Sequence, residues 1–317
     1  MKKLLVVLLS LLMLTNLCAC GSKTEDTNNT GTDDEPAWVY EGVGYDKLME
    51  TMGKSEIDLS NADGTLAKVL EKGELVMATS PDYPPAEFVD ALTGEVKGSD
   101  ILLGQYIANS LGVTLKVESM DFGAVLTSLD TGKSDIAISG FGYKEDRAEV
   151  YELSIGYQAK SSAAHHTILV RAEDVDKYNS LADFAGKTID AQANSLQQMY
   201  VEDQLTESNL QLVSTLDIAL LELSSKKVDA VALDSTTAKN HAENSNGMFV
   251  SLYSEKGIEF DLSQYKDVAG NVVACKKGET SLINAVNEII TDIMEKGTYA
   301  DMYYAACDAA GVVPSEE

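Results

Sequence analysis

The chain of 317 residues carries 51 Asp and Glu against 24 Lys and Arg, a formal net charge of -27. Nucleic acids and anionic lipid surfaces are bound by basic faces, so this balance argues against either as a partner. The length is sufficient for two medium-sized domains with a large buried core.

The N-terminus is typical of an export signal. Two lysines give residues 1–3 a positive charge, and residues 4–14 form an apolar run. That run is too short to span a membrane, which takes about 20 apolar residues, and it matches the apolar core of a signal peptide. Leu17, Ala19 and Cys20 then resemble a bacterial lipobox. The lipobox implies lipidation of Cys20 and anchoring of the exported chain to the outer face of the cell membrane; a plain secretory signal is the alternative.

The next segment is polar and acidic. Residues 22–35 contain almost no apolar side chain and are rich in Thr, Asn, Asp and Glu. Such a composition buries too little surface to offset the entropy lost on ordering. We therefore predict a signal peptide at residues 1–19, and an acidic flexible tether and N-terminal extension at residues 20–60.

The remainder alternates predicted strands and helices. Apolar runs indicate strands at residues 75–79, 114–118, 136–139, 187–191, 210–214, 228–233 and 271–275. Helical spacing of apolar residues indicates helices at residues 102–111, 122–129, 181–185, 195–205, 216–223, 282–293 and 299–306. Ser99 or Asp100 is expected to cap the first of these helices, and Gly112 to end it. The alternation predicts α/β units with mostly parallel strands.

One spacing occurs in both halves. A leucine, a lysine four residues later and an aspartate at the start of an apolar strand occur as Leu129, Lys133 and Asp135 and again as Leu223, Lys227 and Asp229. Two similar α/β lobes explain this echo, and so does chance reuse of a common helix-turn-strand arrangement. Because ligands of such sheets bind beyond the carboxyl ends of the strands, residues 139–140 and 234–235 are candidate binding positions.

Five segments in order carry a resemblance to a known family. They are SPDYPP with EF (80–88), MDF (120–122), SG with EDRAE (139–149), KKVDAV with Asp234 (226–234) and GTY (297–299). Through them the chain resembles the extracellular solute-binding protein family 3, the polar amino-acid binders of ABC importers. The resemblance implies a type II periplasmic-binding-protein-like α/β fold of two lobes with a ligand cleft between them, and partnership with the permease subunits of an ABC transporter.

The same resemblance divides the folded part. Residues 66–156 together with 270–311 are expected to form lobe 1, and residues 162–265 to form lobe 2. Two linking strands between the lobes would permit hinge closure around a ligand.

The resemblance also assigns ligand contacts. The guanidinium of Arg147 suits the carboxylate of a free amino acid, which it can hold through two hydrogen bonds. Asp234, an acceptor when ionised, suits the ammonium. The rings of Tyr83 and Phe122 can enclose the side chain of the ligand. The remaining implied contacts are Ser139, Gly140 and Gly142 from lobe 1, and Asn194 and Ser195 from lobe 2.

Each of these residues also has a purely structural interpretation. Arg147 lies in a charged run that would ordinarily be solvated, Phe122 suits a helix core, and Asp234 suits a helix cap. Asn194 and Ser195 are common cap residues as well. The sequence departs from the family at Gly142, where a Ser or Thr is usual, and at Ala193-Asn194, where Gly-Thr is usual, so the identity of the amino acid stays open.

Little indicates catalysis or a cofactor. His165 and His166 are adjacent, so in a strand their side chains point to opposite faces, which disfavours a shared metal. Cys275 and Cys307 lie in apolar surroundings and are interpreted as buried thiols, with a disulfide as the alternative. We predict a binding protein without a cofactor. Alternatives are an enzyme on the same fold, such as a dehydratase, or a sensor that passes ligand occupancy to a membrane receptor.

Overall fold

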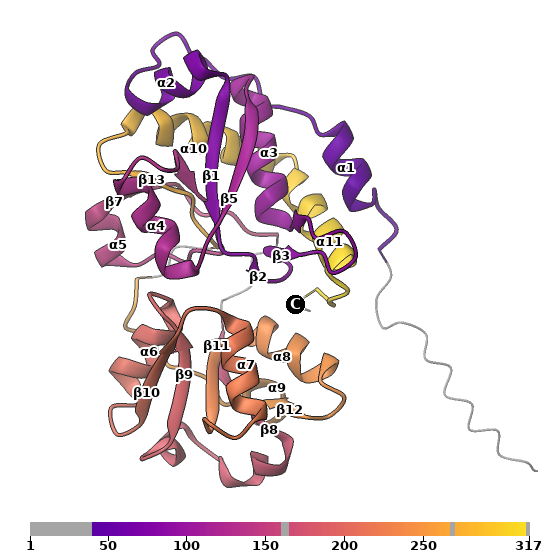
Figure 1. The fold of residues 1–317 in the computed structure, drawn as a ribbon, viewed down its shortest axis with the longest axis vertical. Coiled ribbons are helices and arrows are strands. Elements are labelled where there is room, and N and C mark those ends of the chain that lie inside the picture. The colour runs from indigo at the N-terminus through magenta and orange to yellow at the C-terminus, as the bar shows by residue number, and fades with distance from the viewer. Residues whose placement is uncertain (1–39, 160–164, 267–269, 315–317) are drawn as a thin grey trace, which may run out of the picture. The chain divides into compact units, whose positions relative to one another are not determined.

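The computed structural model describes residues 40–159, 165–266 and 270–314 (Figure 1). The predicted signal peptide, Cys20 and most of the predicted tether lie outside these ranges, as do parts of the predicted linking strands. Within the described ranges no helix is long and apolar enough to cross a membrane. The α/β prediction is confirmed, because the chain forms two five-stranded sheets flanked by helices.

The first sheet defines lobe 1 and has the strand order β5-β1-β6-β13-β7. Its strands are β1 (Glu74–Thr79), β5 (Thr114–Ser119), β6 (Ile136–Ala137), β7 (Tyr151–Leu153) and β13 (Ala274–Lys276). Its helices are α2 (Gly64–Lys72), α3 (Ser99–Leu111), α4 (Phe122–Asp130), α5 (Glu145–Val150), α10 (Thr280–Glu295) and α11 (Thr298–Ala310). In α10 the buried residues recur every three or four positions, so one face of this helix packs into the core.

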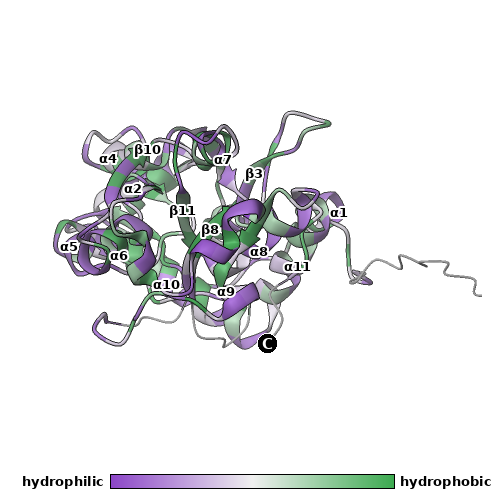
Figure 2. Ribbon diagram, turned by 90° about the horizontal axis from the view of Figure 1, so that it is seen from below, coloured by the Kyte–Doolittle hydropathy of each residue, from purple (hydrophilic) through white to green (hydrophobic). Residues whose placement is uncertain are grey.

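The second sheet defines lobe 2 and has the order β10-β9-β11-β8-β12. Its strands are β8 (His166–Arg171), β9 (Thr188–Gln192), β10 (Asn209–Val213), β11 (Ala230–Asp234) and β12 (Phe249–Ser251). Its helices are the short η1 (Ala172–Lys177) and η2 (Leu181–Phe184), then α6 (Leu196–Gln204), α7 (Leu216–Ser224), α8 (Ser235–Asn244) and α9 (Leu252–Lys256). The inner strands β8 and β11 are buried along nearly their whole length, and the middle residues of both are hydrophobic, as expected for strands covered on both faces (Figure 2).

A small antiparallel sheet accompanies lobe 1. It consists of β2 (Asp82–Tyr83), β3 (Glu87–Val89) and β4 (Val96–Lys97) in the order β2-β3-β4. β2 follows directly on the carboxyl end of β1, so the small sheet sets Asp82, Tyr83 and Glu87 at the end of the main sheet where binding positions are expected.

The repeated spacing has the same geometry in both lobes. The Asp135 N–H donates to the Val76 carbonyl at 2.8 Å, and the Asp135 carboxylate accepts from the Val76 N–H at 2.9 Å. Asp229 makes the same pair of bonds with Thr188, at 2.8 and 2.9 Å. Each aspartate thus fastens one strand to the start of its neighbour, and the echo reflects two similarly built lobes.

The described part of the N-terminal extension packs on lobe 1. Helix α1 (Tyr45–Thr51) buries Tyr45, whose hydroxyl accepts from the Gly98 N–H at 2.9 Å and donates to the Gly98 carbonyl at 3.1 Å. Ser55 is buried as well and donates from its hydroxyl to Asp292 of α10 at 2.5 Å. Residues 40–60 are therefore part of the folded lobe.

Two details of the predicted fold are wrong. The sheets are mixed rather than mostly parallel, since two of the four strand pairings in each sheet are antiparallel. In lobe 1 both antiparallel pairings involve β13, the strand on which the chain returns from lobe 2. In lobe 2 both involve β8, which lies between β11 and β12 and runs opposite to each. In addition, neither Ser99 nor Asp100 caps α3; both are buried inside its first turn, and Gly98 holds the cap position.

Candidate functional site

Arg147 is buried, not solvated. It lies in α5 with 6% of its surface exposed, above the Phe141 ring at 4.9 Å. Its Nη1 donates to the Gly142 carbonyl at 2.5 Å, and its Nη2 donates to the Asn194 carbonyl of lobe 2 at 3.0 Å. Burial lowers the pKa of Arg147 to about 10, so the guanidinium keeps its charge at neutral pH. A partly desolvated cation thus lies where the two lobes meet.

The residues opposite Arg147 form the start of α6. Asn194 has a positive φ of 67°, and its N–H donates to the Gln198 side chain at 2.6 Å. Ser195 is the N-cap of α6 and accepts from the Gln198 N–H at 3.1 Å, as the structural interpretation of this residue predicts. The hydroxyl of Ser195 is therefore already used within lobe 2.

Gly142 lies against Leu196 of lobe 2. A Cβ atom placed on Gly142 would overlap the Leu196 side chain of lobe 2. A Ser or Thr at this position would force Leu196 to move. Gly142 thus allows the Leu196 side chain of lobe 2 to approach the backbone of lobe 1.

Asp234 and Tyr83 meet across the lobes. The Tyr83 hydroxyl on β2 donates to Asp234 Oδ2 at the end of β11. Asp234 Oδ1 accepts from the Thr237 N–H at 3.0 Å and so caps α8. Desolvation raises the pKa of Asp234 and the hydrogen bonds from Thr237 lower it. The helix-cap interpretation of Asp234 is confirmed, and one of its oxygens still faces a lobe 1 residue.

A second carboxylate, on Asp82, also bridges the lobes. Its Oδ2 accepts from Gln192 Nε2 and from the Leu216 N–H, both at 2.8 Å, and its Oδ1 accepts from the Ser80 hydroxyl at 2.9 Å. Leu216 is the first residue of α7, and the side chain of the N-cap residue Thr215 makes no capping bond. An aspartate of lobe 1 therefore caps a helix of lobe 2.

Ser139 and Gly140 direct their donors into lobe 1. The Ser139 hydroxyl is buried and donates to Glu87 at 3.0 Å, while the Gly140 N–H donates to Asp100 at 2.8 Å. Phe122 packs against Phe141, with ring centroids 5.0 Å apart, which matches its interpretation as a helix-core residue. Ser139, Gly140 and Phe122 therefore contact the interior of lobe 1 next to the candidate site.

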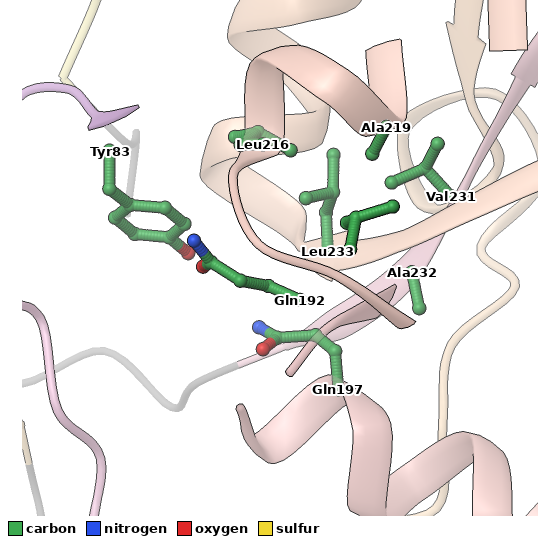
Figure 3. Close-up of a pocket in the computed structure, with 9 residues that line it drawn as sticks. Tyr83, Gln192, Gln197, Leu216, Ala219, Val231, Ala232 and Leu233 are labelled. Carbon is green, nitrogen blue, oxygen red and sulfur yellow. The ribbon is translucent and has the colours of Figure 1, made fainter. Parts of the chain in front are cut away.

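A small pocket lies between Tyr83 and lobe 2. Its lining consists of Tyr83, Gln192, Gln197, Val213, Leu216, Ala219, Val231, Ala232 and Leu233. Figure 3 shows the amide ends of Gln192 and Gln197 directed toward the Tyr83 side, with the apolar side chains of α7 and β11 behind them. The pocket thus offers two amides and an aromatic ring at one end and an apolar surface at the other.

The predicted site residues fall into two groups. Gly142, Arg147 and Asn194 are joined by hydrogen bonds, and Tyr83 is joined to Asp234 while its ring lies against Gly140. Within the described ranges, no ion pair or hydrogen bond links Arg147 to Asp234 directly. The cation Arg147 and the carboxylate of Asp234 are therefore separate, and each is hydrogen-bonded to its own neutral neighbours.

Three residues of this region were not predicted from the sequence: Asp82, Gln192 and Gln197. A signal for Gln192 was present, since it ends β9 as Asp234 ends β11, and strand ends are the expected binding positions. Asp82 lies inside the quoted 80–85 motif, but its contacts with lobe 2 depend on tertiary structure alone.

The histidines and cysteines have structural roles. His166 is buried beside Gln197 at 3.1 Å, and burial lowers the pKa of His166 to about 4, so it is neutral at neutral pH. His165 instead contacts Glu259 at 2.5 Å. Cys275 and Cys307 are free and buried, and burial raises the pKa of each thiol to about 12. In the described part of the chain no cluster of ligating side chains suits a metal ion.

Two mixed α/β lobes whose strand ends carry the facing polar residues define a type II periplasmic binding protein. The chain belongs to the bacterial extracellular solute-binding proteins, family 3, which it matches over residues 75–305. Membership of this extracellular family implies export.

Known relatives support the assignment. An amino acid ABC transporter substrate-binding protein, AbpA from Streptococcus pneumoniae, bound to L-arginine, shares 31% identity over 77% of this chain and 98% of its own, with a TM-score of 0.69. The arginine-binding extracellular protein ArtP of Bacillus subtilis is 25% identical over 71% of this chain and 83% of its own. The L-cystine-binding protein TcyJ of Escherichia coli is 22% identical over 74% and 83%. The named relatives are binding proteins.

Proposed function

We propose that this chain captures a free amino acid between its lobes and delivers it to the permease of an ABC importer. The observation that carries the proposal is one charge of each sign at the lobe junction, each with neutral partners: Arg147 of lobe 1 bonds to the Asn194 carbonyl, and Asp234 of lobe 2 accepts from the Tyr83 hydroxyl. The relatives that bind arginine or cystine belong to the same family and support it.

The ligand carboxylate would take the place of the carbonyl groups that Arg147 now contacts. Both Gly142 and Asn194 offer the guanidinium only neutral oxygens, and a carboxylate makes a stronger, charge-assisted pair. The ligand ammonium would replace the Tyr83 hydroxyl at Asp234, and the Tyr83 ring would then cover the ligand. Phe122, Ser139, Gly140 and Ser195 hold these groups in place.

The test is a thermal-shift screen of the purified chain, from residue 20 onward, against the common amino acids and cystine. A ligand at about 100 times its dissociation constant adds roughly 2.7 kcal/mol to the free energy of unfolding, which gives a clear rise in melting temperature. Chromatography of the same mixtures detects any product. A rise without product supports capture, whereas conversion of a screened compound would show an enzyme, and a flat screen would contradict the proposal.

We also propose that the exported chain is anchored to the outer face of the cell membrane by a lipid on Cys20. The support is the apolar run at residues 4–14 followed by Leu17, Ala19 and Cys20. Cys20→Ala should move the protein from the membrane fraction to the medium, while Cys275→Ala should leave it in the membrane fraction. Retention of the Cys20 variant on the membrane would contradict the anchor.

A further inference from the structure

Two carboxyl groups are buried side by side behind the end of β6. Glu87 of β3 is 1% exposed and Asp100 of α3 is 0% exposed. Ionised groups are seldom buried unless an opposite charge compensates them. A pair of carboxyl groups in this position therefore needs a reason.

The pair holds the turn that follows β6. Glu87 Oε1 accepts from the Ser139 hydroxyl at 3.0 Å, and that hydroxyl accepts from the Ser80 N–H at 2.9 Å. Asp100 accepts from the Gly140 N–H at 2.8 Å and from the Tyr157 hydroxyl at 3.0 Å. Both the side chain and the backbone of this turn are thereby fixed by the two carboxyl groups.

The turn in question supports the ligand site. Gly140 has a positive φ of 55°, and a Cβ placed there would lie 3.6 Å from both the Tyr83 ring and Glu87. Tyr83 in turn reaches Asp234 of lobe 2. A displacement of Gly140 would therefore move the ring that covers the proposed ligand.

The titratable groups that act on the pair are all acids. The titratable groups acting on it are Asp82 of β2, Tyr157 and Tyr299 of α11. Burial, followed by the charge of Asp100, raises the pKa of Glu87 well above its ordinary value, and burial raises the pKa of Asp100 to about 6. Asp100 is the better acceptor because an N–H and a hydroxyl both donate to it, so the proton resides on Glu87.

We propose that Glu87 and Asp100 are positioning residues of the binding site that share one proton, and that loss of this proton as the pH rises loosens the Ser139-Gly140 turn and weakens ligand binding. This inference rests on the proposed capture of an amino acid. It assigns a regulatory role to groups that do not touch the ligand.

The sign of the pH effect follows from linkage. A glutamate whose pKa is higher in the folded chain than the ordinary 4.5 retains a proton that the unfolded chain releases. Its contribution to stability is complete below that ordinary value and declines as the pH rises toward the folded pKa. Above the folded pKa both carboxyl groups are charged and repel each other.

The test compares three variants with the parent in two assays. Glu87→Gln is a permanent mimic of the protonated acid, because its amide can accept from Ser139 and donate to Asp100. Asp100→Asn turns an amide N–H₂ toward Gly140 or Tyr157, both of which are donors. Glu71→Gln removes an exposed carboxylate from the same lobe and is the matched control.

The first assay is denaturant unfolding of the ligand-free chain from about pH 6 to about pH 9, and it needs no ligand. The parent and Glu71→Gln should lose stability relative to Glu87→Gln as the pH rises. Parallel curves for the parent and Glu87→Gln would overturn the shared proton, whatever the protein binds.

The second assay is calorimetric titration with L-arginine, the ligand of the Streptococcus relative, far below the unfolding temperature. Between about pH 6 and pH 9 the affinity of the parent should fall roughly tenfold more than that of Glu87→Gln. Titration of the ligand ammonium affects both proteins equally, so the comparison between them removes its contribution. Asp100→Asn should bind on the order of tenfold to a hundredfold more weakly at neutral pH while circular dichroism shows it folded.

These outcomes separate the two proposals. If Asp100→Asn binds as tightly as the parent, or if parent and Glu87→Gln lose affinity in parallel, the positioning role is wrong although capture stands. If neither L-arginine nor any compound of the amino-acid screen binds the parent, the proposed function fails, and the unfolding assay still decides whether the pair shares a proton.

Discussion

At the scale of single residues, burial decides what the charged side chains of the site do. Arg147 is nearly enclosed and is satisfied by two carbonyl oxygens rather than by a carboxylate. Asp234 accepts from one helix N–H and one hydroxyl. Each charge thus has neutral partners, and a zwitterion of matching polarity would give both a charged one.

We expect truncation of either charge to weaken binding strongly. Arg147→Ala or Asp234→Ala leaves one charge of the ligand desolvated and without a partner, at a cost of roughly 2 to 5 kcal/mol. This corresponds to about 30-fold to several thousand-fold in affinity. Calorimetric titration with the amino acid found in the screen measures it directly.

The control for this measurement is an exposed lysine. Lys144 is unsuitable because its side chain is only 15% exposed beside Asp146, whereas Lys133 is exposed on the surface of the same lobe. Lys133→Ala should change affinity little, since exposed charges contribute about 0 to 1 kcal/mol. An Arg147→Ala variant that binds like this control would remove the basis of the amino-acid assignment.

At the scale of elements, the junction depends on the start of one helix. The N-terminus of α7 receives its capping bond from Asp82 of β2 instead of from its own N-cap residue. Burial raises the pKa of Asp82, and the bond from the Leu216 N–H opposes that rise. The cap exists only while the two lobes are in contact, so it favours the closed arrangement.

We predict that Asp82→Ala shortens the lifetime of the ligand complex. It removes the acceptor for Gln192 and Leu216 in the closed state only, at a cost of about 1 to 3 kcal/mol. Stopped-flow fluorescence should therefore show release about 5-fold to 150-fold faster, with little change in the association rate. Asp261→Asn, which affects an exposed aspartate bonded within lobe 2, is the control; equal release rates for both variants would contradict the cap.

At the scale of the whole molecule, the lobes meet through polar contacts and the Tyr83 ring. Hydrogen bonds of Asp82, Tyr83 and Arg147 join lobe 1 to lobe 2, and the Tyr83 ring packs against a lobe 2 cluster. Each lobe otherwise has hydrophobic cores of its own. Separation of the lobes would expose polar groups that water can satisfy and would leave most of the core intact. The fold is thus suited to opening and closing about its linking segments.

We expect ligand binding to shift this equilibrium toward the closed form. Small-angle X-ray scattering of the chain from residue 20 onward should show a smaller radius of gyration with saturating ligand than without it. The Asp82→Ala variant should require more ligand for the same compaction, because its closed form is weaker. An unchanged radius at saturation would exclude closure as part of the binding step.

Much of the fold was predictable from local patterns, and the exceptions have physical causes. The observed α10 and β1 match their predicted positions within a few residues, because apolar spacing and Gly punctuation are local signals. The mixed sheets and the interior position of Asp100 were not predictable in this way. Strand direction depends on how distant segments pair, and burial of a carboxyl group depends on partners such as Gly140 and Tyr157.

The sequence by itself determined the family, the α/β class and the residue types of the candidate site, since the motifs around Tyr83, Arg147 and Asp234 are contiguous in the chain. Tertiary structure alone decided which of these groups face the lobe junction. It turned Ser139 and Gly140 inward to Glu87 and Asp100, and it brought Asp82 to a helix of the other lobe. The reason is that hydrogen bonding and desolvation act between segments 40 to 134 residues apart in the chain, over which no local pattern extends.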